Sequence, residues 1–169
     1  PCGGGGGREG TENYRKDAGP APVHLRFALR KAIDLLHEEG LENAFRRHSL
    51  LGEAARRAVS AWTEGQVLGF NIAEASERSN TVTTVTMSNG HDPAVLQRYC
   101  KDKCGVVLGT GIGDLSGQAF RIAHMGHVNA PMLLGTLGVI EVALNALKIP
   151  HGKGGLEAAA TYLGEEVEA

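Results

Sequence analysis

The chain has 169 residues, of which 42% are hydrophobic and 5% aromatic, and its formal net charge is −2. This size predicts a single domain with enough apolar side chains for a core. The small net charge provides no strong field, which argues against nucleic acid or an anionic membrane as a partner. An odd number of cysteines, Cys2, Cys100 and Cys104, is typical of a reducing compartment, so we expect a cytoplasmic protein without a disulfide framework.

The first residues of the chain have a composition unlike the rest. Five consecutive glycines follow Cys2, and a polar stretch comes after them. Such a segment buries too little apolar surface to offset the entropy lost on ordering. We expect residues 1–19 to be a flexible segment, for which a non-native origin is one interpretation, and residues 20–169 to form the folded domain. The first residue is Pro1 and not Met, which is typical of a fragment of a longer protein.

Two helices are predicted next, over 23–39 and about 41–63. Apolar side chains recur in the first helix at helical spacing and form one stripe along it. The stripe consists of Leu25, Leu29, Ile33 and Leu36. Gly40 separates the two helices, and we expect it to end the first one in the left-handed conformation that glycine adopts readily.

After residue 63 the hydrophobic period changes from 3.6 to 2, which indicates strands. Asp92 followed by Pro93 is typical of a helix start, because the first caps the helix and the second fits its first turn. The predicted strands cover 67–72, 81–87, 105–108 and 119–125, and the predicted helices cover 93–104, 129–149 and 155–166. This order predicts an α+β domain, with an antiparallel sheet of about three to four strands and helices packed on one side.

The apolar run over 132–149 is long enough to suggest a membrane-spanning helix. Glu141, Asn145 and Lys148 lie within it at spacings of four and three residues, so they form one polar stripe on a helix. A spanning helix rarely carries such a stripe. We therefore expect a largely buried helix and no membrane segment.

Residues 119–125 place an arginine on a strand among small and apolar neighbours. Phe120 and Ile122 point to one face of this strand, and Arg121 points to the other. The planar guanidinium has five N–H donors and matches a carboxylate through two parallel hydrogen bonds. A ligand carboxylate is therefore one interpretation of Arg121. A surface arginine, or one paired with a distant acid, is the other, and spacing alone favours it.

Three other patterns are considered as ligand sites and rejected. Residues 109–113 lack the third glycine of a dinucleotide fingerprint and precede a strand, not a helix. Cys100 and Cys104 lie four residues apart on a helix without the further ligands that a metal needs. His124 and His127 point to different faces of a strand, and no carboxylate motif accompanies them. We predict no nucleotide site and no metal site.

The segment Phe120-Arg121-Ile122-Ala123-His124-Met125-Gly126 resembles the F-R-I-G-H-M-G segment of class V aminotransferases, which use pyridoxal phosphate. The most similar branch comprises the alanine–glyoxylate, serine–glyoxylate and pyridoxamine–pyruvate aminotransferases. Upstream segments resemble the same branch in the same order. They are Ala28–Ala32 (A-L-R-K-A), Glu38–Asn43 (E-E-G-L-E-N), Arg47-His48 and Gly111–Gly117 (G-I-G-D-L-S-G). The resemblance begins near Ala18 and covers only the C-terminal small domain of the family.

The resemblance implies the C-terminal part of an enzyme that moves an amino group between a small amino donor and glyoxylate or pyruvate. It implies that Arg121 binds the carboxylate of the amino-acid or keto-acid substrate, and that the intact protein is a homodimer. In the family, the Schiff-base lysine, the acid at the pyridine nitrogen and the phosphate cradle lie in the large domain. We therefore expect no catalytic residue, no cofactor-binding residue and no activity in this chain alone.

One position departs from the family pattern. Pro20 replaces the threonine that reaches the cofactor phosphate, and proline has neither a hydroxyl nor an N–H to offer. Together with the missing lysine, this favours a second hypothesis, a non-catalytic remnant or interaction module that keeps the small-domain fold. A cysteine desulfurase of the same superfamily is a weaker alternative. Its cysteine lies on a mobile loop, whereas Cys100 and Cys104 are predicted on a helix.

Overall fold

The computed structural model describes residues 22–166, and the chain divides into two compact units, 1–41 and 42–169. Each unit is described by itself. The expectations for residues 1–19 and for Pro20 lie outside the described residues. Within the described range, no helix combines the length and the apolar character needed to cross a membrane.

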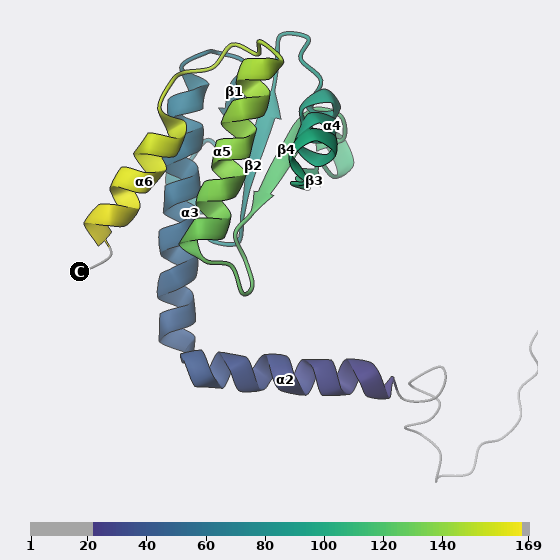
Figure 1. Cartoon of the computed structure of the whole chain (residues 1–169), viewed down its shortest axis with the longest axis vertical. Coiled ribbons are helices and arrows are strands. Elements are labelled where there is room, and N and C mark those ends of the chain that lie inside the picture. Colours follow the sequence, from purple (N-terminus) through teal and green to yellow (C-terminus); the bar gives the residue numbers. More distant parts are fainter. Residues whose placement is uncertain (1–21, 167–169) are drawn as a thin grey trace, which may run out of the picture. The chain divides into compact units, whose positions relative to one another are not determined.

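The first unit contributes helix α2 (Val23–Glu39), at the bounds that the sequence predicts (Figure 1). The helix ends where the Gly40 N–H donates to the Leu36 carbonyl over 2.9 Å. Gly40 has a positive φ of 86°, but its ψ of 136° lies outside the left-handed helical region that we predicted. The chain therefore leaves the helix in an extended direction. No residue of α2 is buried, and the side chains of Leu25 and Phe27 are 69% and 71% exposed.

The second unit contains helices that begin and end close to their predicted bounds. They are α3 (Leu41–Thr63), α4 (Pro93–Cys104), α5 (Ala130–Ala146) and α6 (Gly155–Glu166). The Asp92 carboxylate accepts a hydrogen bond from the Ala94 N–H at the start of α4, and the Asn129 side chain does the same for the Met132 N–H in α5. Each of these helices also has a proline in its first turn, so local sequence signals determine where they start.

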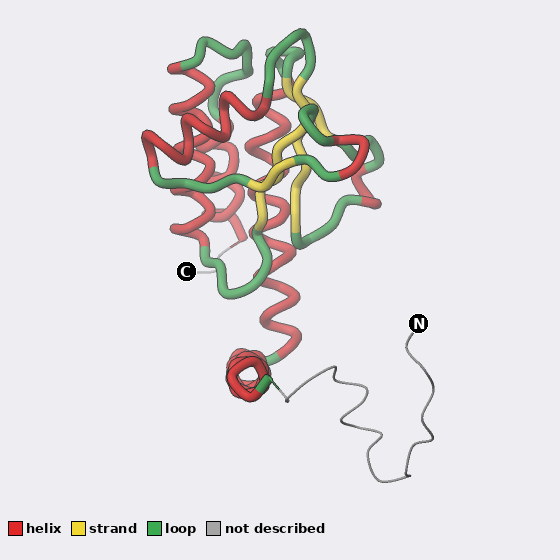
Figure 2. Tube along the Cα trace, turned by 90° about the vertical axis from the view of Figure 1, so that its right-hand side faces the viewer, coloured by secondary structure: helices red, strands yellow, loops and turns green. Residues whose placement is uncertain are grey.

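Within residues 22–166, four strands form one antiparallel sheet in the order β1-β2-β4-β3. They are β1 (Leu68–Phe70), β2 (Val82–Met87), β3 (Gly109–Thr110) and β4 (Ala119–Ala123). This confirms the predicted α+β class and the antiparallel sheet. Figure 1 shows α3 and α5 running alongside β2 and β4, and Figure 2 shows the same unit from its side.

The third strand is not where the sequence predicted it. We expected residues 105–108, but the strand pairs only at Gly109 and Thr110. Gly105 ends α4 in the left-handed conformation, and the N–H of Val106 donates to the Cys100 carbonyl over 3.0 Å. Residues 105 and 106 therefore complete the end of a helix, and the chain reaches its partner strand only afterwards.

The core lies between one face of the sheet and the helices. Val85 of β2 and Phe120 of β4 lie opposite each other in register, and both are fully buried. Side chains from all four helices described in this unit complete the same cluster. They include Val59 and Trp62 of α3, Leu96 of α4, and Leu137 and Ile140 of α5. The predicted helical covering of one side of the sheet is thus what buries the apolar face.

A single carboxylate joins three of these helices. Oε1 of Glu141 in α5 accepts a hydrogen bond of 2.9 Å from the Trp62 indole N–H in α3. The same oxygen accepts a bond of 2.9 Å from the Leu156 N–H in the first turn of α6. Gly155 lies so close to the indole that a Cβ there would overlap Trp62 Nε1. Glu141 therefore satisfies a buried donor and caps α6 with one oxygen atom.

We predict that Glu141→Ala lowers the free energy of unfolding, because it leaves the Trp62 indole and the Leu156 N–H without their acceptor. Each unsatisfied buried donor costs about 1–3 kcal/mol. Glu141→Gln keeps a carbonyl oxygen at the same place and should stay much closer to the wild type. Urea denaturation measures both variants, and equal losses in the two would contradict this role of the oxygen.

Candidate functional site

Arg121 lies in the middle of β4, on the sheet face opposite the core. It pairs in register with Thr84 of β2 on one side and with Gly109 of β3 on the other. Its neighbours along the strand, Phe120 and Ile122, are fully buried, whereas Arg121 is half-buried. The predicted alternation of faces is therefore confirmed, and the guanidinium belongs to the open face.

The side chain of Arg121 leans toward β3. Its Nε–H donates a hydrogen bond of 2.7 Å to the Thr110 carbonyl. Among residues 22–166 no hydrogen-bond or ion-pair partner is found for Nη1 and Nη2, so four N–H donors remain for a ligand. A distant acid was one interpretation from the sequence, and none of the described residues takes that place. The arrangement can bind an anion with two parallel acceptors.

The loop between β3 and β4 is closed by its own hydrogen bonds. The Gly111 N–H donates to the Ala119 carbonyl over 3.0 Å, and the Gln118 side chain donates to the Asp114 carbonyl over 2.8 Å. Residues 113–115 form one short 3-10 turn, and β4 follows. The glycines of 109–113 therefore precede no helix of the kind that binds a dinucleotide.

The loop after β4 is held by two residues of α3. Nη1 of Arg47 donates to the carbonyls of Gly126 and Val128 over 2.7 and 3.0 Å. His48 donates from Nδ1 to the Ala44 carbonyl, and its Nε2 accepts from the Gly126 N–H over 3.0 Å. The sequence matched Arg47-His48 and the 120–126 segment as separate motifs. The structure brings them into contact, and this contact fixes the chain five residues beyond Arg121.

His124 is buried at the end of β4 and uses both ring nitrogens. Nδ1 donates to the Asn80 carbonyl over 3.0 Å, so Nε2 is the acceptor for the Thr83 hydroxyl at 2.9 Å. The pKa of His124 is lowered to about 4, mainly by burial and to a smaller extent by Arg56 and His48, while the bond to the Asn80 carbonyl acts in the opposite direction. A neutral histidine with both nitrogens bonded is a structural residue of the core.

The two described cysteines lie on α4, as predicted. Cys100 is fully buried, and burial raises the pKa of its thiol to about 11, so it stays protonated and unreactive. Cys104 is half-buried at the end of the helix. Over residues 22–166, no three side chains of His, Cys, Asp or Glu gather as metal ligands would.

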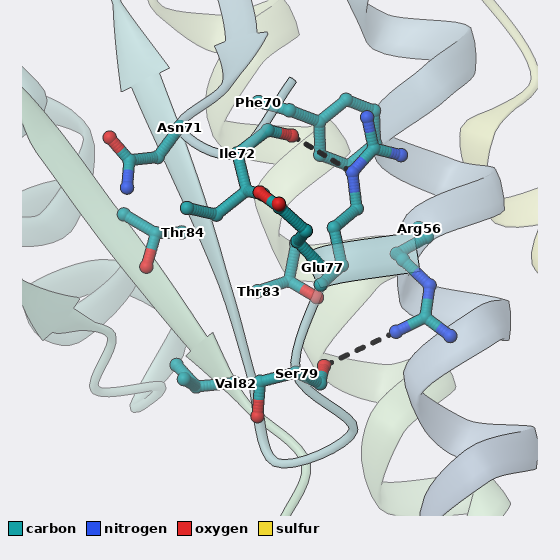
Figure 3. A pocket seen from close by; sticks show the side chains of 10 residues that line it. Arg56, Phe70, Asn71, Ile72, Glu77, Ser79, Val82, Thr83 and Thr84 are labelled. Atoms are coloured by element: carbon teal, nitrogen blue, oxygen red, sulfur yellow. Dashed lines mark hydrogen bonds between the residues drawn. The ribbon is translucent and has the colours of Figure 1, made fainter. Parts of the chain in front are cut away.

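A pocket with a volume of about 270 Å³ lies beside β1 and β2 (Figure 3). Strand β1 is the edge of the sheet opposite to β3. The Arg78 guanidinium stacks over the Phe70 ring at 3.8 Å and donates from Nε and Nη2 to the Ile72 and Ala73 carbonyls. These bonds fold the segment after β1 back on itself. Arg121 does not line this pocket, because its guanidinium reaches toward β3, but its register partner Thr84 does.

The sequence predicted Arg121 but missed the residues that surround it. Thr110 and Gln97 carry no local signal for a site, because Thr110 contacts Arg121 only through the pairing of β3 with β4, and Gln97 contacts only Gly109 of that strand. The unusual glycine pattern at 109–113 was the one available clue. It marks a close approach between backbone and side chain, not a phosphate loop.

No family model matches the chain. It is 38% identical over 148 residues to the serine–glyoxylate aminotransferase of Methylorubrum extorquens, which covers 85% of this chain and 35% of that protein. The serine–glyoxylate aminotransferase of Arabidopsis thaliana is also 38% identical, with 86% and 35% covered. The crystal structure of pyridoxamine–pyruvate aminotransferase from Mesorhizobium loti matches with a TM-score of 0.72 at 31% identity, over 79% of this chain and 34% of that one. The chain thus spans about a third of the length of these relatives.

The low pKa of His124 predicts a pH dependence of stability. Between its folded value of about 4 and its ordinary value of 6.5, the unfolded chain binds more protons than the folded one. The free energy of unfolding should therefore rise with pH across this window and reach its full value above it. The expected gain is about 3 kcal/mol at 1.36 kcal/mol for each unit of pKa.

Urea unfolding of the wild type and of His124→Gln at several pH values isolates this contribution. The variant should lose the rise between the two pKa values, because glutamine does not titrate. Parallel pH profiles for the two proteins would show that His124 is not responsible.

Proposed function

Because the chain is homologous to a part of the class V aminotransferases, about a third of their length, we propose that it belongs to an aminotransferase dependent on pyridoxal phosphate. The enzyme would move an amino group between a small amino donor and glyoxylate or pyruvate. Relatives named for glyoxylate and for pyruvate both match this chain, which supports this substrate class. The matched length agrees with a single domain, the C-terminal small domain of our sequence analysis.

The observation that carries the proposal is that Nη1 and Nη2 of Arg121 have no hydrogen-bond or ion-pair partner among residues 22–166. The keto acids glyoxylate and pyruvate, and every amino-acid donor, have a carboxylate, and an arginine guanidinium binds this group through two parallel hydrogen bonds. The bond from Nε to the Thr110 carbonyl holds the side chain on the sheet, so its terminal nitrogens point the same way before a ligand arrives. Arg121 would bind and orient the substrate, and take no part in proton transfer.

The described residues do not fit the cofactor itself. Pyridoxal phosphate needs a lysine amine for its aldehyde and several donors for its phosphate. The side chains beside Arg121 on the open face are small and carry no amine. They are Thr84 and Ala123, with Gly109 on the other side. When bound, the cofactor would supply the electron sink of the reaction, and its binding residues would come from outside the described part of this chain.

The proposal includes a cytoplasmic homodimer as the assembly of the intact protein. The apolar side chains of α2 support association, since Leu25, Phe27 and Leu29 are 60–71% exposed. A monomer in sedimentation of the intact protein would count against it.

Arg121→Lys in the intact protein should impair catalysis far more than folding. Lysine keeps the charge but loses the two-point fork, at a cost of about 1.5–3 kcal/mol for a charge-assisted hydrogen bond. This corresponds to a loss of about 10- to 150-fold in kcat/KM. The loss should be found with every amino-acid donor and every keto-acid acceptor, because each has a carboxylate, and the cofactor absorbance should be unchanged.

Arg98→Lys, at an exposed arginine on α4, is the matched control and should keep full activity. An Arg121→Lys variant that melts at a lower temperature but turns over normally per folded molecule would show that Arg121 is structural.

A non-catalytic remnant or interaction module is the second candidate. The observation in its favour is the absence of a lysine beside Arg121 among the described residues. Under both candidates, this chain alone should show no transaminase activity and no Schiff-base absorbance with pyridoxal phosphate. Borohydride fixation of the cofactor on one defined lysine, found by mass spectrometry, would overturn this expectation. Activity of the intact protein would exclude the remnant.

A further inference from the structure

We propose that Gly109, Thr110 and Gln97 are positioning residues that make Arg121 bind a carboxylate end-on, through Nη1 and Nη2. This inference rests on the proposed function of Arg121. The inference goes further by identifying the edge of the guanidinium that contacts the ligand and the residues of this chain that select this edge.

The first step is the bond between Arg121 and Thr110. A guanidinium offers a carboxylate two kinds of edge, one formed by Nε with one Nη, and one formed by both Nη atoms. Nε carries a single hydrogen, and the Thr110 carbonyl accepts it at 2.7 Å. A carboxylate on the Nε edge would have to break this bond. The end formed by both Nη atoms keeps its donors, so it is the edge left for two-point binding.

The second step is the missing side chain at Gly109. Arg121 lies across this residue, which is its direct partner in register. A Cβ on Gly109 would stand 3.1 Å from Arg121 Cβ and 3.3 Å from Nε. These separations are shorter than ordinary van der Waals contact, so a side chain at 109 would push Nε away from the Thr110 carbonyl. Glycine leaves the arginine room to lie flat on the strand.

The third step is the support of β3 by α4. This strand pairs with β4 at only two residues, so little backbone pairing holds the Thr110 carbonyl in place beside Arg121. The Gln97 side chain donates from Nε2 to the Gly109 carbonyl over 2.7 Å and fastens the strand to the helix. Leu108 is buried just before it. Strand β3 is thus attached to the core on the side away from the ligand.

The whole 169-residue chain, labelled with ¹⁵N at arginine, provides the test, with acetate as the probe. In the wild type, the Arg121 Nε–H signal should exchange slowly with water and should not move with acetate, while the Nη signals shift. Gly109→Ala should speed the exchange of Nε–H. It should also weaken acetate binding about two- to tenfold, because a released side chain must be ordered again on binding.

Gly135→Ala on α5 is the matched control, since a Cβ there has open space, and it should leave both signals unchanged. Gln97→Leu removes the link to α4 and should act in the same direction as Gly109→Ala. Wild-type chemical shifts in the core of each variant show that the fold is kept.

The two proposals fail differently. If acetate moves the Nε signal as much as the Nη signals, or if Gly109→Ala changes neither exchange nor affinity, end-on positioning is wrong while Arg121 remains a carboxylate site. If acetate moves no Arg121 nitrogen although Nε–H stays protected, the proposed carboxylate role of Arg121 and this inference are both overturned.

Discussion

The pairing of β2 with β4 is the constraint on which the rest of the second unit depends. In this register Val85 lies opposite Phe120 and Thr84 lies opposite Arg121. Since neighbouring residues of a strand point to opposite faces, one set of backbone hydrogen bonds sends the aromatic ring to the helices and the guanidinium to the open face. A slip by one residue would bury the arginine without a partner and expose the phenylalanine. The same strand register therefore determines both the core and the candidate site.

Both ends of β4 are fixed by groups from other parts of the chain. At its start, the Ala119 carbonyl accepts from the Gly111 N–H, which closes the loop from β3. Beyond its end, Arg47 and His48 of α3 bind the carbonyl and the N–H of Gly126. The longest helix of the unit thus holds the loop that leaves the arginine strand. Two segments far apart in the sequence, Arg47-His48 and Gly126, are thereby held together.

Much of the fold follows from local signals. Asp92 and Pro93 predicted the start of α4, and the alternation of side chains around Arg121 predicted which sheet face Arg121 lies on. The structure confirms both predictions. The third strand could not be placed in this way, because the end of α4 takes up Gly105 and the residue after it. The partner of Nε could not be predicted either. Register is a property of two strands together, so Thr110 carries no sign of its role in its own neighbourhood.

The shortness of β3 has a dynamic consequence. Segments that pair at few residues open with low free energy, independently of the global unfolding of the core. The Thr110 carbonyl, which accepts the Arg121 Nε–H, belongs to such a segment. Strand β3 pairs at two residues, and a hydrogen bond from the Gln97 side chain connects it to α4. The open face can therefore lose its order while β2, β4 and the helices stay folded. The orientation of the Arg121 guanidinium would then be the least heat-resistant property of the domain, lost before its secondary structure melts.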